Sequence, residues 1–189
     1  GLSRYSTDPQ WTVPHFEKML YDNALFAQAL IEAWLVTGKD YYGAYAEDVL
    51  QYVRRDMTAP EGAFYSAEDA DSEGEEGKFY VWKPAEVVTL LDGEDARAAL
   101  NYWNIAPRGN FEHGTSILHL AKPLAEMAEE LRTDESELRL RLAGSKARLL
   151  QARERRVRPG IDDKILADWN GLMIGALAFG GRVLGESRY

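Results

Sequence analysis

Two clusters of polar side chains in this chain contain residues that could move a proton. A histidine beside carboxylates is a common acid/base set, and polar groups at the start of a buried helix need a partner or a ligand. The same groups could instead form a structural hydrogen-bond network, and both interpretations stay open. Trp169 could likewise stack on a sugar ring or fill the core. The clusters comprise His15, Glu17, Lys18, Tyr21 and Asp22, and Asp162, Asp163, Lys164, Asp168, Trp169 and Asn170.

A third group of acidic residues lies within the segment 68–76. Asp69 and Asp71 match the start of a calcium-binding EF-hand loop, but Tyr80 stands where the closing glutamate belongs. We therefore predict no EF-hand, and no metal ligand is assigned. A looser cation site, a solvated acidic tip and a loop folded over a pocket remain open, and the last would bring Glu68, Asp69 and Asp71 to a site.

Composition limits the classes of function. The chain has 189 residues, 46% of them apolar and 28% charged, which suffices for one sizeable core, so we expect a single domain over residues 1–189. A net charge of −9 argues against binding to nucleic acid or to an anionic membrane. The absence of cysteine removes disulfides, thiolate nucleophiles and cysteine-based zinc sites. No apolar run is long enough to span a membrane, so we expect a cytoplasmic protein, and no cofactor is assigned.

Two further features are interpreted as structural. Eight basic residues lie between Arg139 and Arg158 on a predicted amphipathic helix, and in an acidic protein they favour a solvated outer face over a nucleic-acid patch. His119, between Leu118 and Leu120, is typical of a buried histidine with its hydrogen bonds satisfied.

The two polar clusters lie at the starts of two copies of one helical unit, and matching residues of the two copies are 147 positions apart. The identities between the copies fall on a helix body and on the glycine that stops it, where an internal repeat should show. Equivalent helices of a ring or solenoid start at the same end, so the clusters could meet in one site. The matched pairs are Asn23 and Asn170, Leu25 and Leu172, Leu30 and Leu177, Val36 and Val183, Gly38 and Gly185, and Tyr42 and Tyr189.

Apolar periodicity predicts an all-α fold built of helical hairpins with one irregular insertion. Recurrence every 3.6 residues marks the helices, Pro84 begins one of them, and Asp134 with Glu137 resembles a capping box at the start of another. Two short aromatic runs, 63–66 and 78–82, favour strands that would close a β-hairpin with an acidic tip. We expect helices over residues 16–37, 41–57, 84–91, 95–103, 123–131, 134–157 and 163–184.

We also expect the chain to be a piece truncated at both ends. It begins with Gly1 rather than Met, and it stops at Tyr189, where the first copy continues into another helix. Inner-helix surface that absent helices would cover should then be exposed, and the protein should tend to self-associate.

Three long motifs resemble those of the YyaL-like proteins, a family that includes the animal spermatogenesis-associated, thioredoxin-domain-containing relatives. Asn110–Glu112 and Leu118–His119 lie between them, so the resemblance covers nearly the whole chain. The motifs are Trp11–Asn23, Phe64–Trp82 and Asp162–Ile174.

The resemblance implies a fold. Family members are similar in having an N-terminal thioredoxin-like domain followed by a six-hairpin α/α toroid like that of N-acylglucosamine 2-epimerases and related glycosidases. This chain would be a middle part of the toroid, without the rest of the ring and without the thioredoxin-like domain. Epimerases of this fold use two inner-helix histidines to move a proton beside a sugar carbonyl. Here only His15 is so placed, and Asp162 occupies the matching position.

The resemblance also places a site at the end of the toroid where inner helices start. Lys164 should neutralise at least one carboxylate there. The acid/base candidates are His15, Glu17, Asp22, Asp69 and Asp163, and the candidates for binding a saccharide or other small polar ligand are Tyr21, Glu68, Asp71, Lys164, Trp169 and Asn170.

Two classes of function follow. One is a sugar isomerase, epimerase or glycosidase-like enzyme, in which one carboxylate or histidine acts as base and another as acid. The other is a non-catalytic module that binds a ligand or a partner as part of a thioredoxin-domain-containing protein. An enzyme needs two titrating groups whose pKa values are pushed apart, whereas a structural network keeps its carboxylates ion-paired and ionised.

Overall fold

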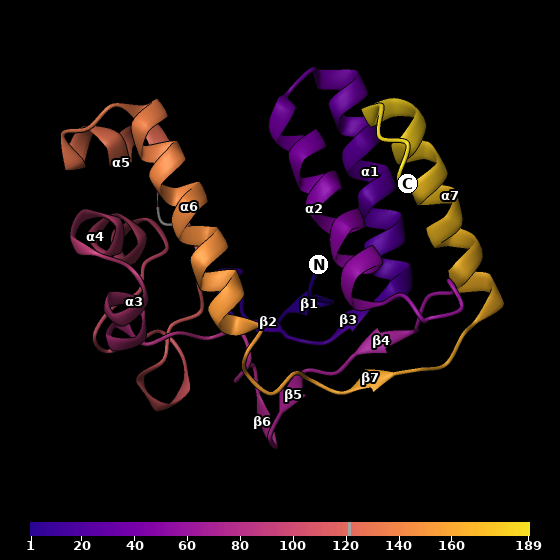
Figure 1. The fold of residues 1–189 in the computed structure, drawn as a ribbon, viewed down its shortest axis with the longest axis horizontal. Coiled ribbons are helices and arrows are strands. Elements are labelled where there is room, and N and C mark those ends of the chain that lie inside the picture. Colours follow the sequence, from indigo (N-terminus) through magenta and orange to yellow (C-terminus); the bar gives the residue numbers. More distant parts are fainter. Residues whose placement is uncertain (121) are drawn as a thin grey trace. The chain divides into compact units, whose positions relative to one another are not determined.

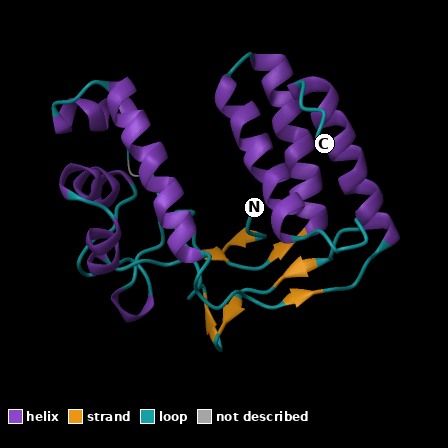
Figure 2. Ribbon diagram, viewed as in Figure 1, coloured by secondary structure: helices purple, strands orange, loops and turns teal. Residues whose placement is uncertain are grey.

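The chain folds into two compact units. The computed structural model describes residues 1–120 and 122–189. The first unit comprises Gly1–Ser6, Pro14–Glu76 and Pro159–Tyr189, and the second comprises Thr7–Val13 and Gly77–Arg158. The single domain over residues 1–189 stays a prediction, and each unit is described by itself. The predominance of helices, with only short strands, confirms the predicted all-α class (Figure 2).

Three helices form the body of the first unit. They are α1 (Leu20–Thr37), α2 (Asp40–Asp56) and α7 (Ala167–Leu184), and α1 packs against both others (Figure 1). Because α1 is covered on two sides, its apolar stripe is broad. The core of this unit contains Leu20, Ile31, Leu50, Val53 and Met173, all with no exposed surface.

The two helices of the repeat are equivalent in structure. Both α1 and α7 have 18 residues, and both end at a glycine in the left-handed conformation, Gly38 with a φ of 67° and Gly185 with a φ of 72°. Each glycine N–H donates to the carbonyl four residues earlier, of Trp34 and of Gly181. The structure therefore confirms the internal repeat and its stop signal.

A small antiparallel sheet lies at the end where α1 and α7 start (Figure 1). Its strands are β3 (Lys18–Met19), β4 (Ala67–Glu68) and β7 (Ile161–Asp162), with β4 in the middle. The helix starts predicted at residues 16 and 163 are therefore wrong. Residues 18–19 pair as a strand before α1 begins at Leu20, and residues 163–166, which follow β7, are neither helix nor strand.

The predicted β-hairpin is displaced along the sequence. Residues 63–66 and 78–82 form no strands and make only isolated bridges, at Phe64 and Trp82, whose side chains pack in the helical cores of the two units. The hairpin lies in the predicted acidic tip, between β5 (Asp71–Ser72) and β6 (Glu75–Glu76). Its turn residues, Glu73 and Gly74, have φ of 54° and 79°, the left-handed values of a tight two-residue turn. A further pair joins β1 (Tyr5–Ser6) to β2 (Pro14–His15).

The second unit contains the remaining helices. They are α3 (Pro84–Leu90), α4 (Gly93–Tyr102), α5 (Leu124–Leu131) and α6 (Glu135–Arg153), with a 3₁₀ turn at Glu112–Gly114. As predicted, Pro84 begins α3, and Asp134 caps α6 by accepting from the backbone N–H groups of Ser136 and Glu137. The Ser136 hydroxyl also donates to this carboxylate, and this hydrogen bond, followed by the two from the backbone, lowers the pKa of Asp134. Helix α6 ends before the predicted residue 157.

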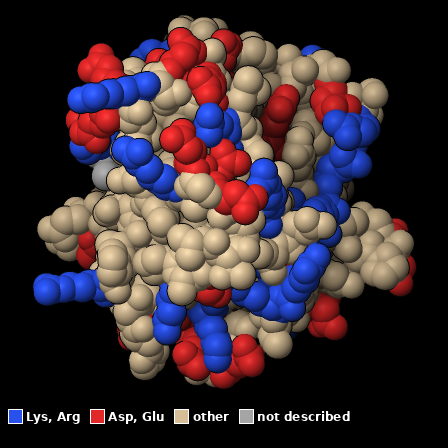
Figure 3. All heavy atoms as spheres, turned by 60° about the vertical axis from the view of Figure 1, so that its left-hand side comes forward, with Lys and Arg blue, Asp and Glu red and all other residues tan. Residues whose placement is uncertain are grey.

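Ion pairs support the interpretation of the basic run as a solvated face. On α6, Arg139 pairs with Glu135 at 2.6 Å, and Arg141 pairs with Glu137 at 2.8 Å. Arg148 reaches Asp95 at 3.4 Å. Acidic and basic side chains are mixed on the face that Figure 3 shows. Within the described part of the chain, no helix is long and apolar enough to cross a membrane.

The exposed faces of α1 and α7 lead to a prediction of self-association. Phe26 is 42% exposed and Ile174 is 60% exposed, and Leu25 and Leu172 add to this apolar surface. We expect light scattering at rising protein concentration to show dimers or larger species, and Phe26→Ser with Ile174→Ser to shift the population toward monomer. A wild-type protein that stays monomeric at high concentration would contradict this.

Candidate functional site

One face of the small sheet borders a cavity of about 360 Å³ in the first unit. Side chains alternate between the two faces of a strand, so Met19, Ala67 and Asp162, which pair across the sheet, share a face. Asp69 N–H donates to the Gly160 carbonyl at 2.8 Å, which extends the pairing beyond β4. The cavity is lined by Glu17, Met19, Ala67, Asp69, Gly160, Ile161 and Asp162.

Strand β4 is the element that brings the two polar clusters together. Ser66 N–H donates to the Asp162 carbonyl at 3.1 Å, and Leu20 N–H donates to the Ser66 carbonyl at 2.9 Å. The segment that follows α2 is thus joined to the starts of both repeat helices. His15 and Asp163 lie at the same end of the helical layer, on β2 and directly after β7, as the shared site requires (Figure 1).

Glu17 is held by two basic groups. Arg4 Nη1 lies 3.0 Å from its carboxylate, and His15 Nε2 lies 3.5 Å away. The other ring nitrogen of His15 lies 2.9 Å from Glu76, and the ring stacks on Tyr5 with 4.9 Å between centroids. These contacts fix the orientation of His15 and place it beside a carboxylate of the cavity.

The other two carboxylates of the cavity differ in their partners. Lys164 Nζ lies 2.7 Å from both carboxylate oxygens of Asp162, and this hydrogen bond lowers the pKa of Asp162. Lys164 therefore pairs with a carboxylate, as expected. Within residues 1–120 and 122–189, no basic side chain lies at ion-pair distance from Asp69, which is exposed. Asp69 is thus the carboxylate that a ligand can engage most directly.

Asp22 is the carboxylate whose environment favours the protonated form. Burial raises its pKa, and the charge of Glu17 raises it further, against the opposing effect of Arg4. Its Oδ2 atom is buried and has no hydrogen-bond partner. The start of α1 would by itself favour an anion, but the cost of removing the carboxylate from water is the larger effect here.

The raised pKa of Asp22 gives a prediction about stability. An acid whose pKa is higher in the folded state than in the unfolded state destabilises the fold at neutral pH, and the penalty disappears as pH falls below the unfolded value near 3.8. We expect Asp22→Asn to melt at a higher temperature than wild type at pH 7 and to match it at about pH 3, where the carboxyl is protonated in both states. Thermal denaturation of both proteins across this range measures the difference. An equal difference at both pH values would show that the charge is not the cause.

The opposite face of the sheet is a buried structural cluster. Glu68 has no exposed surface, and Tyr52 Oη donates to its carboxylate at 2.9 Å. Lys18, opposite Glu68 in the sheet, is 7% exposed and lies 4.7 Å above the Tyr52 ring. Glu68, predicted to bind a ligand, does not line the cavity, because strand alternation turns it away from Asp69.

The side-chain amide of Asn170 is hydrogen-bonded to the backbone of Phe64 and Leu166. Its Nδ2 donates to the carbonyls of Phe64 at 2.9 Å and Leu166 at 3.0 Å, and its Oδ1 accepts from Phe64 N–H at 2.8 Å. The equivalent Asn23 makes the same contacts with Leu2 and Met19. Asn170, predicted to bind a ligand, therefore holds an extended segment against its helix.

The remaining predicted residues lie near the cavity or outside it. The rings of Tyr21 and Trp169 contact each other edge to face at 4.7 Å, and Trp169 packs against the core of the first unit. Tyr21 also interacts with Arg4, since the pKa of Arg4 is raised first by its hydrogen bond to Glu17 and then by Tyr21. Asp71 and Asp163 are exposed and do not line the cavity.

Three residues of this site were not among the predicted candidates. Asp162 was passed over for Asp163, and only the strand, which orients one of two adjacent side chains toward the cavity, distinguishes them. Arg4 comes from a segment without a chemical motif. Glu76 ends the acidic segment 68–76, but nothing in the sequence indicates that the β5–β6 hairpin brings this glutamate to His15. Among the described residues, no three His, Asp or Glu side chains are grouped so as to hold a metal ion.

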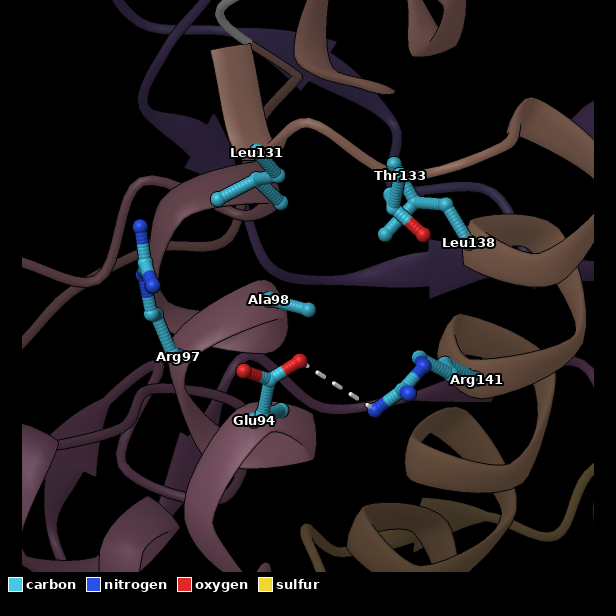
Figure 4. A pocket seen from close by; sticks show the side chains of 7 residues that line it. All are labelled: Glu94, Arg97, Ala98, Leu131, Thr133, Leu138 and Arg141. Carbon is cyan, nitrogen blue, oxygen red and sulfur yellow. Dashed lines mark ion pairs between the residues drawn. The ribbon is translucent and has the colours of Figure 1, made fainter. Parts of the chain in front are cut away.

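A small pocket in the second unit is too narrow for a ligand. Figure 4 shows it between α4 and α6, with Glu94 and Arg141 pointing toward each other at 3.8 Å. Its volume of about 30 Å³ suits a water molecule.

Comparison with known proteins finds relatives that align with the whole length of this chain. No protein-family model matches it. It is 38% identical to human spermatogenesis-associated protein 20 and 36% identical to the mouse protein of the same name, in each case over 100% of this chain and 27% of the relative. It is 29% identical to an uncharacterized protein of Caenorhabditis elegans, B0495.5, over 100% of this chain and 29% of that protein. The chain is therefore a homologue of spermatogenesis-associated protein 20 that spans about a quarter of the length of that relative.

Proposed function

We propose that the first unit binds a saccharide or a similar polyhydroxylated small molecule in the cavity beside the sheet. The observation that carries this proposal is that Glu17, Asp69 and Asp162 line one cavity of about 360 Å³. This volume is in the range of small-molecule sites, and carboxylates accept hydrogen bonds from ligand hydroxyl groups. Arg4 and His15 orient the Glu17 carboxylate. Lys164 orients that of Asp162, so both acceptors are held in place before a ligand binds.

The test is titration of the protein with mono- and disaccharides, followed by isothermal calorimetry or ligand-observed NMR. We expect Asp69→Asn and Glu17→Gln each to weaken binding about tenfold or more, because each removes a charge-assisted hydrogen bond. Asp71→Asn and Asp163→Asn are matched controls, since both side chains are exposed and outside the cavity, and they should bind as wild type. Equal losses in the controls, or no binding of any saccharide, would refute the proposal.

Acid/base catalysis on the bound sugar is a second candidate. It is favoured by the opposite pKa shifts of two carboxylates at this end of the unit, raised for Asp22 and lowered for Asp162. A sugar isomerase, epimerase or glycosidase-like reaction needs such a pair, one group holding a proton and the other ionised. Asp22 does not line the cavity, so it would act on the reaction through Glu17, whose charge it feels.

Binding and catalysis can be separated by experiment. NMR of each saccharide that binds would show whether it is converted to an epimer, an isomer or a hydrolysis product. In the catalytic case, Asp22→Asn should stop conversion while binding persists, since Asp22 does not line the cavity. Binding without any conversion by the wild-type protein would leave the alternative, a non-catalytic binding module.

The relatives are longer than this chain, and several expectations concern the whole protein. We infer that the chain is the middle part of a six-hairpin α/α toroid in a thioredoxin-domain-containing protein that acts in the cytoplasm. The repeat of α1 and α7, with α2 packed on α1, supports a ring of hairpins. Trypsin-resistant fragments of a full-length relative would test this, because a closed toroid should resist cleavage as one unit that contains this segment.

A further inference from the structure

The second unit contains a larger cavity that belongs to no site described so far. Its volume is about 350 Å³, which is enough for a small organic molecule. Residues on α6 form one wall, and Trp82, Trp103 and the segment 118–120 form the others. It is lined by Trp82, Trp103, Leu118, His119, Leu120, Lys146, Leu149, Leu150 and Arg153.

The lining is apolar and aromatic, with positive charge. The Trp103 indole and four leucines would cover a flat hydrophobic body, and indole faces stack well on aromatic rings. Trp82 is only 2% exposed, and the Arg156 guanidinium lies 4.0 Å from its ring centroid, so it closes the cavity rather than offering a stacking face. Lys146 and Arg153 are the charged residues of the lining, and no acidic residue is among the described lining residues. This combination favours a ligand that joins an apolar ring system to an anionic group.

Hydrogen bonds hold the wall that contains His119. Asn110 is fixed by Ile117, since its Oδ1 accepts from Ile117 N–H at 2.7 Å and its Nδ2 donates to the Ile117 carbonyl at 3.0 Å. The same Nδ2 lies 3.2 Å from His119 Nδ1, and Asn104 lies 2.9 Å from His119 Nε2. Both ring nitrogens of His119 therefore have partners, as the sequence predicts, but the side chain is half-buried at the cavity rather than buried.

Backbone hydrogen bonds also hold the two tryptophans of the lining. Trp82 and Ser116 exchange two backbone hydrogen bonds, at 3.0 and 2.7 Å. His119 N–H donates to the Trp103 carbonyl at 3.3 Å. The backbone of Trp82, Trp103 and the 118–120 segment is therefore held in place, so the walls of the cavity are formed before a ligand binds.

We propose that this cavity binds a small aromatic or fused-ring molecule carrying a carboxylate or sulfonate group. The ring system lies against Trp103 and the leucines of the lining, and the anionic group lies at Lys146 and Arg153. The proposal does not depend on the saccharide site, because every lining residue of this cavity is in the second unit and every lining residue of the other is in the first.

Two fluorescent probes with the same aromatic body test both parts of the proposal. 1-Anilinonaphthalene-8-sulfonate carries the anionic group, and N-phenyl-1-naphthylamine lacks it. We expect the sulfonate to bind the 189-residue protein at least about threefold more tightly, as one favourable ion pair provides. Lys146→Gln should remove most of that difference, and Arg139→Gln, which also neutralises a charge on α6 but outside the cavity, should not.

A variant that fills the cavity distinguishes probe binding in the cavity from probe binding on other apolar surface. Leu150→Phe adds volume inside the cavity and should weaken both probes about tenfold, whereas Leu140→Phe, at a position that is 75% exposed, should leave both unchanged. Far-ultraviolet circular dichroism confirms that each variant is folded. Equal binding of both probes in wild type, or binding that Leu150→Phe does not weaken, would overturn the proposal.

Discussion

Replacing Asn170 with alanine is expected to lower the free energy of unfolding by about 3 kcal/mol. Asn170 is 9% exposed, and its amide satisfies both the N–H and the carbonyl of Phe64, a residue that is itself buried. Alanine would leave these two backbone groups without partners in the interior, and each such group costs about 1 to 3 kcal/mol. The segment after α2 would lose its attachment to α7.

Urea denaturation followed by circular dichroism measures this loss. Asn101→Ala is the matched control, because Asn101 also donates to the carbonyl four residues earlier in its helix but holds no other segment. It should change the free energy of unfolding by less than about 1 kcal/mol. Asn23→Ala should resemble Asn170→Ala, since Asn23 makes the equivalent contacts with Leu2. Similar losses for Asn101→Ala and Asn170→Ala would show that the contact with Phe64 contributes nothing.

Replacing Glu68 with alanine is expected to lower the free energy of unfolding by about 3 kcal/mol. Glu68 is fully buried, accepts the hydrogen bond of Tyr52, and lies opposite Lys18, which is 7% exposed. Alanine would leave the Tyr52 hydroxyl without this acceptor, and it would remove a negative charge from the strand position opposite Lys18. A charge that loses its compensation inside a protein is among the most destabilising changes known.

Two further variants identify the cause of that loss. Glu68→Gln keeps an acceptor for Tyr52 and removes only the charge, so its stability should lie between wild type and Glu68→Ala. Glu61→Ala, at an exposed turn position, controls for removal of a glutamate and should be close to neutral. The unfolding midpoints in urea decide between these outcomes. If Glu68→Gln were as stable as wild type, charge compensation of Lys18 would not be the main contribution.

The sequence alone determined the helices and the repeat. A helix buries a stripe with a period of 3.6 residues, so each helix of ten or more residues carries its own evidence, and a glycine or a capping aspartate marks its end or start. For this reason the equivalence of α1 and α7, the glycine stops at Gly38 and Gly185, and the cap at Asp134 were all predictable. The presence of His15, Glu17 and Asp69 at one end of the repeat helices also followed from this reasoning.

Only the tertiary structure decided which carboxylates share the cavity. The strands β3, β4 and β7 have two residues each, too few for a pattern of alternation to show in the sequence. Their pairing joins positions as far apart as Ser66 and Asp162. That register turns Asp69 and Asp162 toward the cavity and Glu68 away from it. The face on which a strand residue lies is fixed by its partner strand, and here the partners come from distant parts of the chain.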